Sequence, residues 1–140
     1  MQFKRPIIFT NGCFDIIHMG HIEYLKQAKS LGKTLIVGLN SDSSVKRLKG
    51  ESRPINSEKS RKVVLESIKY VDGVFVFDDD DPSDLISSIK PDYFVKGGDY
   101  KIGDLKELPI LRELNVDIKF LKYIENQSTT GTIKKIKQTK

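Results

Sequence analysis

The sequence contains little that could cross-link the chain or carry it through a membrane. Its 140 residues include one cysteine, Cys13, so no disulfide can form within the chain. A single free thiol fits a reducing compartment, and as a small apolar side chain Cys13 is expected to be buried. No apolar run reaches the ~18 residues of a membrane-spanning helix, and the N-terminus lacks the pattern of a secretory signal. These absences predict a cytoplasmic protein.

Charge of one sign is only in modest excess. The chain has 24 Lys and Arg residues against 19 Asp and Glu residues, a net charge of +5, which favours an anionic partner. The basic residues are spread along the sequence, with local groups only at 46–49 and 134–140. Nucleic-acid binding calls for clustered basic residues with stacking aromatics, so we expect small phosphorylated ligands and no nucleic acid. A module that binds nucleotide or nucleic acid without catalysis is the alternative that rests on the charge.

Short β-rich runs alternate with amphipathic segments along the chain. The predicted strands are residues 6–10, 34–40, 73–77, 92–96 and 116–121. Apolar residues recur at helical spacing between them, with Gly32 expected to close the first helix and Ser41 and Ser57 to cap the next two. The predicted helices are 22–31, 42–48, 57–71, 82–89 and 105–114, with a last one capped by residues 128–130.

This alternation predicts the fold class. Parallel strands need crossover helices, and the crossovers are right-handed. We therefore expect an α/β, doubly wound, Rossmann-like sheet of five parallel strands in the order 3-2-1-4-5, with helices on both faces. No linker divides the sequence, so a single domain over residues 1–140 is expected, with a basic, frayed tail from about residue 132.

The stretch NGCFDIIHMGH, residues 11–21, indicates where a ligand binds. It follows the first strand, and ligands of open α/β sheets bind beyond the carboxyl ends of the strands. His21 falls in the first turn of the next helix, whose amino end attracts anions, and Gly20 leaves room for a phosphate between the two rings of His18 and His21. A zinc site needs three or four ligands, and the chain has only these two histidines. Phosphate binding is therefore favoured, with two purely structural histidines as the alternative.

These residues resemble the H-x-G-H nucleotidyltransferases, which join a nucleoside triphosphate to a phosphorylated small molecule and release pyrophosphate. A second motif, NQSTT at 126–130, stands where that family has its I-S-T-T signature. The segments GLNSDSSVKRLKGESRPIN, SRKVVLESIKYVD and PDYFVKGGDY are similar to adenylyltransferases that make ADP-heptose from ATP and D-glycero-β-D-manno-heptose 1-phosphate. The likeness runs from about Phe9 to Thr130, and the absence of a sugar-kinase domain makes the chain look like the stand-alone form.

The resemblance implies a role for each matching residue. The nucleophile is an anionic sugar phosphate oxygen, so the reaction needs positioning and positive charge but no general base. Catalytic roles are expected for His18, His21 and Lys46. Residues expected to contact ATP are Thr10, Asn11, Gly12, Cys13, Phe14, Gly20, Arg61, Lys96, Gly97, Gly98, Ser128, Thr129 and Thr130. Residues expected to contact the sugar phosphate are Asp15, Asn40, Asp42, Lys49, Asp99 and Tyr100. Mg²⁺ is expected to arrive with ATP, and a homodimer is expected from the family.

Several of these residues have a simpler alternative. Arg61 could lie on the surface, Asp15 and Asp42 could stabilise turns, and residues 128–130 could be an ordinary helix cap. Arg47 is interpreted as part of a solvated basic face. The acidic run 78–81 is interpreted as a solvated loop rather than a metal site.

The sequence also departs from the family at two places. Asn126 and Gln127 stand where relatives often have a glycine, which weakens the expected contact with the triphosphate tail. Tyr123 stands where relatives that act on glycerol phosphate carry an arginine, which argues against that substrate. A cytidylyltransferase for glycerol 3-phosphate or another polyol phosphate is the alternative within the same class.

Overall fold

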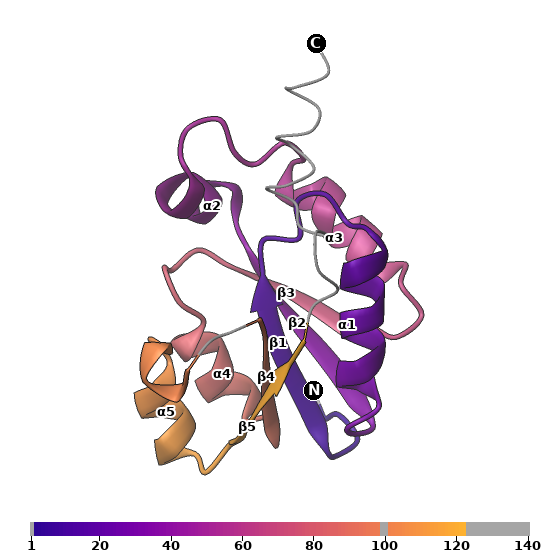
Figure 1. The fold of residues 1–140 in the computed structure, drawn as a ribbon, viewed down its shortest axis with the longest axis vertical. Helices are drawn as coiled ribbons and strands as arrows, with labels where there is room; N and C mark the ends of the chain where they lie inside the picture. The colour runs from indigo at the N-terminus through magenta and orange to yellow at the C-terminus, as the bar shows by residue number, and fades with distance from the viewer. Residues whose placement is uncertain (1, 99–100, 123–140) are drawn as a thin grey trace.

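The computed structural model describes residues 2–98 and 101–122, which form one parallel sheet flanked by helices (Figure 1). The five strands are β1 (Ile7–Gly12), β2 (Thr34–Asn40), β3 (Gly73–Phe77), β4 (Tyr93–Gly97) and β5 (Asp117–Leu121). All pairings are parallel and the order is β3-β2-β1-β4-β5, which confirms the predicted class and topology. The carboxyl end of β1 therefore lies between those of β2 and β4.

Helices cover both faces of the sheet (Figure 1). One face packs against α1 (Met19–Lys29) and α3 (Glu58–Glu66), and the other against α4 (Ser83–Ile89) and α5 (Leu108–Glu113). The short α2 (Asp42–Lys49) lies beyond the carboxyl edge. No helix within residues 2–98 and 101–122 has the length and apolar character to cross a membrane.

The apolar runs form strands because both faces of the sheet are covered. Ile8 contributes to the core under α1 and α3, whereas Phe9 stacks on Phe94 in the core under α4 and α5, with ring centroids 6.2 Å apart. Successive strand residues point to opposite faces, so a strand buried on both sides is apolar throughout. All seven residues of β2 are buried.

Some predicted boundaries differ from the structure. β1 continues two residues past Thr10, because Asn11 and Gly12 still pair with Gly38 and Leu39 of β2 instead of turning. The predicted helix 57–71 ends at Glu66, although Ile68 still packs against the core. The predicted helix 105–114 is divided into a 3-10 turn, η1 (Ile102–Asp104), and α5. Pro109 lies in the first turn of α5, where its missing N–H costs no helical bond.

Gly32 has a different role from the one predicted. α1 ends at Lys29 with Ser30 as its C-cap, so Gly32 does not close the helix. A Cβ at Gly32 would lie 2.6 Å from the carbonyl oxygen of Pro6 and 2.8 Å from Ile8 Cδ1. The glycine is therefore required by the close approach of the N-terminal segment. The predicted last helix and the tail lie outside the described residues.

Candidate active site

The two histidines at the start of α1 cap their own helix. His18 is the N-cap residue, with extended backbone (φ −139°, ψ −177°), and its Nδ1 accepts a hydrogen bond from the backbone N–H of Gly20 (3.1 Å). The Nδ1 of His21 accepts in return from the backbone N–H of His18 (3.2 Å). This is the reciprocal pattern of a capping box, with imidazoles in the places that Ser or Thr and Glu or Gln normally take. Capping thus explains the spacing of the pair and uses only one nitrogen of each ring.

The capping bonds fix the position of the proton on each ring. A neutral imidazole whose Nδ1 accepts a hydrogen bond carries its hydrogen on Nε2. Burial, and then the neighbouring His18, lower the pKa of His21 to about 4, and burial lowers the pKa of His18. Both rings are therefore neutral at neutral pH, with an Nε2–H donor. The ring centroids lie 4.2 Å apart, so the two rings lie side by side at the amino end of α1.

Two buried side-chain atoms in the described part of the chain lack a hydrogen-bond partner, and both belong to the stretch 11–21. They are Nε2 of His18 and Oδ1 of Asn11. Leaving a buried donor or acceptor unpaired costs about 1–3 kcal/mol, so such atoms are uncommon unless a ligand completes them. A phosphate oxygen can accept from Nε2–H of His18. Oδ1 of Asn11 needs a donor, which a hydroxyl or amino group can supply.

The lowered pKa of His21 predicts a pH dependence of stability. The unfolded protein binds this proton near pH 6.5 and the folded protein only near pH 4. The stabilising contribution is therefore complete above pH 6.5 and decreases as the pH falls from 6.5 to 4. His21→Gln removes the titrating group and keeps a side chain suited to this capping position. Urea unfolding of the variant from pH 7 to 4 should show a smaller loss of stability than the wild type, and parallel curves would contradict the prediction.

The residues at the carboxyl end of β1, and Phe14 just after it, are closely packed. The Thr10 hydroxyl is fully buried 2.7 Å from the Tyr24 hydroxyl, which donates to the Val95 carbonyl (3.1 Å). Thr10 therefore joins β1, α1 and β4 through its side chain. The ring of Phe14 folds over Gly12, where a Cβ would lie 2.9 Å from Phe14 Cε2. Phe14 itself has a positive φ (45°) and its ring is buried.

Asp15 holds the connection between α2 and α3 against the site. Its carboxylate is fully buried and accepts from Arg53 Nε (3.1 Å) and from the backbone N–H groups of Ile55 (2.7 Å) and Asn56 (2.8 Å). The Asn56 side-chain amide donates to the Asp15 carbonyl (2.6 Å). Both carboxylate oxygens are thus bonded within the protein. Asp15 therefore stabilises backbone, as in the turn-stabilising alternative, but the backbone belongs to residues 53–56 and not to its own turn. The predicted contact of Asp15 with sugar phosphate is not tested.

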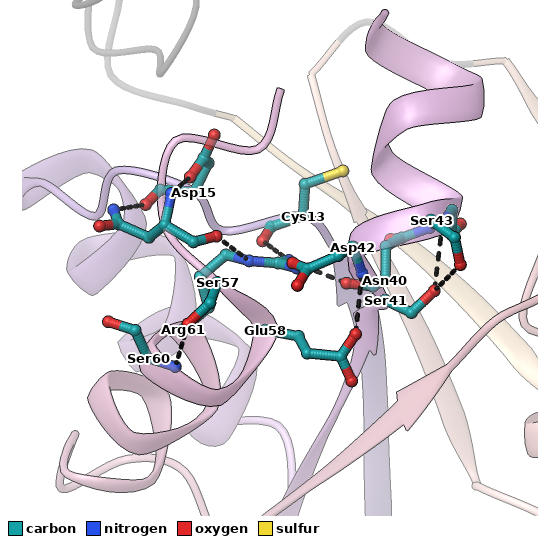
Figure 2. A network of polar contacts seen from close by, with 12 residues as sticks. Cys13, Asp15, Asn40, Ser41, Asp42, Ser43, Ser57, Glu58, Ser60 and Arg61 are labelled. Carbon is teal, nitrogen blue, oxygen red and sulfur yellow. Dashed lines mark hydrogen bonds and ion pairs between the residues drawn. The ribbon is translucent and has the colours of Figure 1, made fainter. Parts of the chain in front are cut away.

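Arg61 lies inside the protein, so the surface alternative for this residue is wrong. Its side chain is 1% exposed, and Figure 2 shows it reaching from α3 toward Cys13, Asn40 and Asp42. Nη1 donates to the carbonyls of Cys13 and Asn40 (both 2.8 Å), and Nη2 pairs with the Asp42 carboxylate (2.8 Å). Nε donates to the Asn56 carbonyl (3.0 Å). The predicted contact of Arg61 with ATP is not tested.

The acidic loop 78–81 docks on α2. Asp78 accepts from the hydroxyls of Ser41 and Ser43, which lowers its pKa, and Asp80 pairs with Arg47 Nε (3.0 Å). Asp78–Asp80 are exposed, as expected for a solvated loop, but they also hold α2. Arg47 is also exposed, as expected for a solvated basic face, and it additionally forms an ion pair with Asp80.

Cations surround Cys13 at the carboxyl edge. Burial raises the pKa of the thiol, whereas Lys49, Arg61 and Arg53 act in the opposite direction. Burial likewise lowers the pKa of Lys96, while Glu107 and Cys13 raise it and Lys49 lowers it. Cys13 after β1, Lys96 of β4 and Lys49 of α2 are therefore close enough to interact electrostatically. The positive field of these groups concentrates anions such as a triphosphate.

Residues 9–135 match the family described as cytidylyltransferase-like. The chain belongs to this family. Similar proteins include the bifunctional protein HldE of Campylobacter concisus, which is 52% identical over 137 residues and is matched by 98% of this chain over 28% of its own length. HldE of Wolinella succinogenes is 51% identical over 132 residues, covering 94% of this chain and 27% of the relative. The chain therefore spans less than a third of the length of these relatives.

Solved structures agree with this membership. A lipopolysaccharide core biosynthesis protein from Thermoplasma volcanium is 30% identical, with a TM-score of 0.67 over 84% of this chain and 95% of that protein. A pantothenate synthetase from Thermus thermophilus shares only the fold, at 14% identity and a TM-score of 0.56 over 86% of this chain and 56% of that protein. Membership of the cytidylyltransferase-like family is consistent with the H-x-G-H motif at the carboxyl edge of the sheet.

In this cytidylyltransferase-like chain the structure describes most of the predicted site residues. His18, Gly20 and His21 lie together at the amino end of α1, and the exposed Lys46 and Lys49 lie on α2. Asn40 is buried and donates from Nδ2 to the Ser44 hydroxyl (3.0 Å), and Asp42 begins α2. Gly97 is the last residue of β4, and Gly98 follows it with a positive φ (86°), as expected for a sharp end. Five predicted residues lie outside the described ranges: Asp99, Tyr100, Ser128, Thr129 and Thr130.

Four residues that support the site were not predicted from the sequence. They are Arg53, Asn56 and Glu58 around α3, and Glu107 before α5. Glu107 is buried, and its pKa is raised by that burial and lowered by Lys96. Their contacts with Asp15, Asp42 and Lys96 join residues 11 to 41 positions apart, so no local pattern could have found them.

The described residues do not fit a dedicated metal site. Within residues 2–98 and 101–122, no group of three or more His, Cys, Asp or Glu side chains is arranged to hold a metal ion. The expectation that Mg²⁺ arrives with ATP is not tested.

Proposed function

We propose that this protein is a nucleotidyltransferase that transfers AMP from ATP to a sugar 1-phosphate, D-glycero-β-D-manno-heptose 1-phosphate, giving ADP-heptose and pyrophosphate. The observation that carries the proposal is the capping box of His18 and His21, which leaves two neutral Nε2–H donors at the amino end of a helix. The choice of substrate is supported by the similarity of nearly the whole chain to HldE and to a lipopolysaccharide core biosynthesis protein.

The residues on the carboxyl edge suit this reaction. A phosphate oxygen of the sugar attacks the α-phosphorus of ATP, an O–P bond forms, and the bond from the α-phosphorus to the departing pyrophosphate breaks. The attacking oxygen is already ionised, so neutral imidazoles with lowered pKa values serve as donors rather than as bases. We assign His18 and His21 to the α- and β-phosphates, where negative charge develops. Lys46 and Lys49 of α2, the latter interacting with Lys96, add positive charge as pyrophosphate leaves.

Asn11 complements the histidines. Its buried Oδ1 is an acceptor, which the ionised oxygens of a triphosphate cannot satisfy. A hydroxyl or amino group of the bound nucleotide can donate to it. In this proposal His18 and His21 bind the phosphates, and Asn11 contacts the nucleoside.

The remaining parts of the proposal concern the assembly and its setting. We propose a homodimer, because α3 exposes Val63 (55%) and Val64 (45%), and the edge strand β3 exposes Val76 (37%). A cytoplasmic location is supported by the single free cysteine. MgATP is the proposed form of the nucleotide.

A pyrophosphate-release assay tests the proposed function. Each of ATP, CTP, GTP and UTP is combined with heptose 1-phosphate or glycerol 3-phosphate. We expect release only with ATP and heptose 1-phosphate at an appreciable rate. Release with CTP and glycerol 3-phosphate would replace the proposal by a cytidylyltransferase. Release with no pair, together with DNA binding that weakens steeply with salt, would instead indicate a binding module.

A further inference from the structure

The guanidinium of Arg61 is bonded to four acceptors that come from four different segments. Its partners are the carbonyls of Cys13, Asn40 and Asn56 and the carboxylate of Asp42, at 2.8 to 3.0 Å. These bonds use four of the five N–H donors of an arginine. The side chain is 1% exposed, whereas Asp42 is 39% exposed, so the arginine is anchored inside and reaches outward.

These acceptors lie where the phosphate-binding segments begin. Cys13 directly follows β1 and starts the loop 13–18, which leads to the histidines. Asn40 ends β2, and Asp42 is the first residue of α2, which carries Lys46 and Lys49. Arg61 thus connects the loop 13–18 to α2. In the sequence, all of α1 and β2 lie between these two segments.

Neighbouring contacts strengthen the same connection. Glu58, the first residue of α3, accepts from the backbone N–H of Asp42 (3.0 Å), so α2 is attached to α3 at a second point. Asp15 of the histidine loop holds Arg53, Ile55 and Asn56 of the segment between α2 and α3. The part of that segment that leads into α3 is therefore tied to the loop 13–18, and Figure 2 shows Asp15, Asp42 and Glu58 around Arg61.

We propose that Arg61 is a positioning residue for the transfer reaction, which fixes the histidine loop and α2 relative to each other instead of binding the triphosphate. The inference rests on the proposed function, in which both segments bind one nucleotide. In-line phosphoryl transfer depends on the placement of cations and donors to within fractions of an ångström. A planar guanidinium can serve four acceptors in fixed directions, whereas a lysine ammonium has three donors and no fixed fork.

The test compares Arg61→Lys with Arg5→Lys. Arg5 is a matched control, because it also donates to a carboxylate (Asp92, 3.1 Å) and a carbonyl (Lys90, 3.1 Å), but before β1 at the opposite edge of the sheet. We expect Arg61→Lys to lower kcat by about 10²-fold with the KM for ATP changed less than about twofold. Arg5→Lys should leave both constants unchanged. Hydrogen exchange of the α2 amides should become faster in Arg61→Lys and not in Arg5→Lys.

Three outcomes would overturn the inference. The first is a folded Arg61→Lys with unchanged kcat. The second is a raised KM for ATP at unchanged kcat, which would assign Arg61 to the triphosphate. The third is an activity loss that only follows the unfolded fraction measured by circular dichroism, which would make the role purely structural.

A second variant covers the case in which Arg61→Lys does not fold. Asp42→Asn removes only the partly exposed partner of Arg61, and we expect kcat to fall about tenfold with the KM values for ATP and sugar phosphate unchanged. A raised KM for sugar phosphate would instead make Asp42 a substrate ligand and contradict the inference. If the wild type releases no pyrophosphate with any substrate pair, the proposed function fails. The hydrogen-exchange comparison still decides whether Arg61 couples α2 to the loop.

Discussion

Replacing His18 by alanine is expected to lower kcat by ~10²–10³-fold, the usual cost of losing one donor to a developing charge. The buried Nε2 of His18 has no partner within the described residues, so its hydrogen bond is available to a phosphate oxygen. His18→Ala also removes the N-cap of α1, which should cost about 1 kcal/mol of stability. Steady-state pyrophosphate release and urea unfolding measure the two effects.

His18→Asn separates catalysis from capping. Asparagine is among the best N-cap residues, but it does not place a donor where Nε2 lies. We expect this variant to be close to the wild type in stability and as impaired as His18→Ala in kcat. Full activity in a folded His18→Asn would show that His18 serves only the helix, and the phosphate assignment would then be wrong.

Asp15→Ala is expected to destabilise the fold by about 3–5 kcal/mol, measured by urea unfolding at pH 7. Asp15 is fully buried, and its loss would leave the buried Arg53 without its counter-ion. It would also leave the N–H groups of Ile55 and Asn56 without their acceptor. The segment between α2 and α3 should loosen, because these bonds fasten it to the loop 13–18.

Asp80→Ala provides the matched control for this prediction. Asp80 also pairs with an arginine, Arg47, at 3.0 Å, but the two side chains are 61% and 47% exposed. Solvent screening limits such a pair to about 1 kcal/mol or less. Similar losses in both variants would show that the burial of the Asp15 pair adds nothing to stability.

Much of the fold could be predicted from the sequence because its signals are local. The strands β2 and β3 have the bounds predicted for them, since a continuous apolar run of five to seven residues is a local signal for a strand in a parallel sheet. The ends of β1 and α3 were less accurate. Asn11 and Gly12 usually make a turn, and here they remain in the strand because β2 offers them partners. Gly32 looked like a helix terminator, whereas its position depends on Pro6, which is distant in sequence.

The sequence by itself determined the order of the elements, the α/β class and the place of the H-x-G-H motif after the first strand. It could do so because periodicity, capping and strand-to-helix spacing are properties of neighbouring residues. Only the tertiary structure decided that the imidazoles cap α1 through Nδ1, that Asp15 binds the segment before α3, and that Arg61 is buried at the meeting point of β1, β2 and α2. These arrangements join residues that are up to 48 positions apart, and their energy depends on burial, which is a property of the folded chain alone.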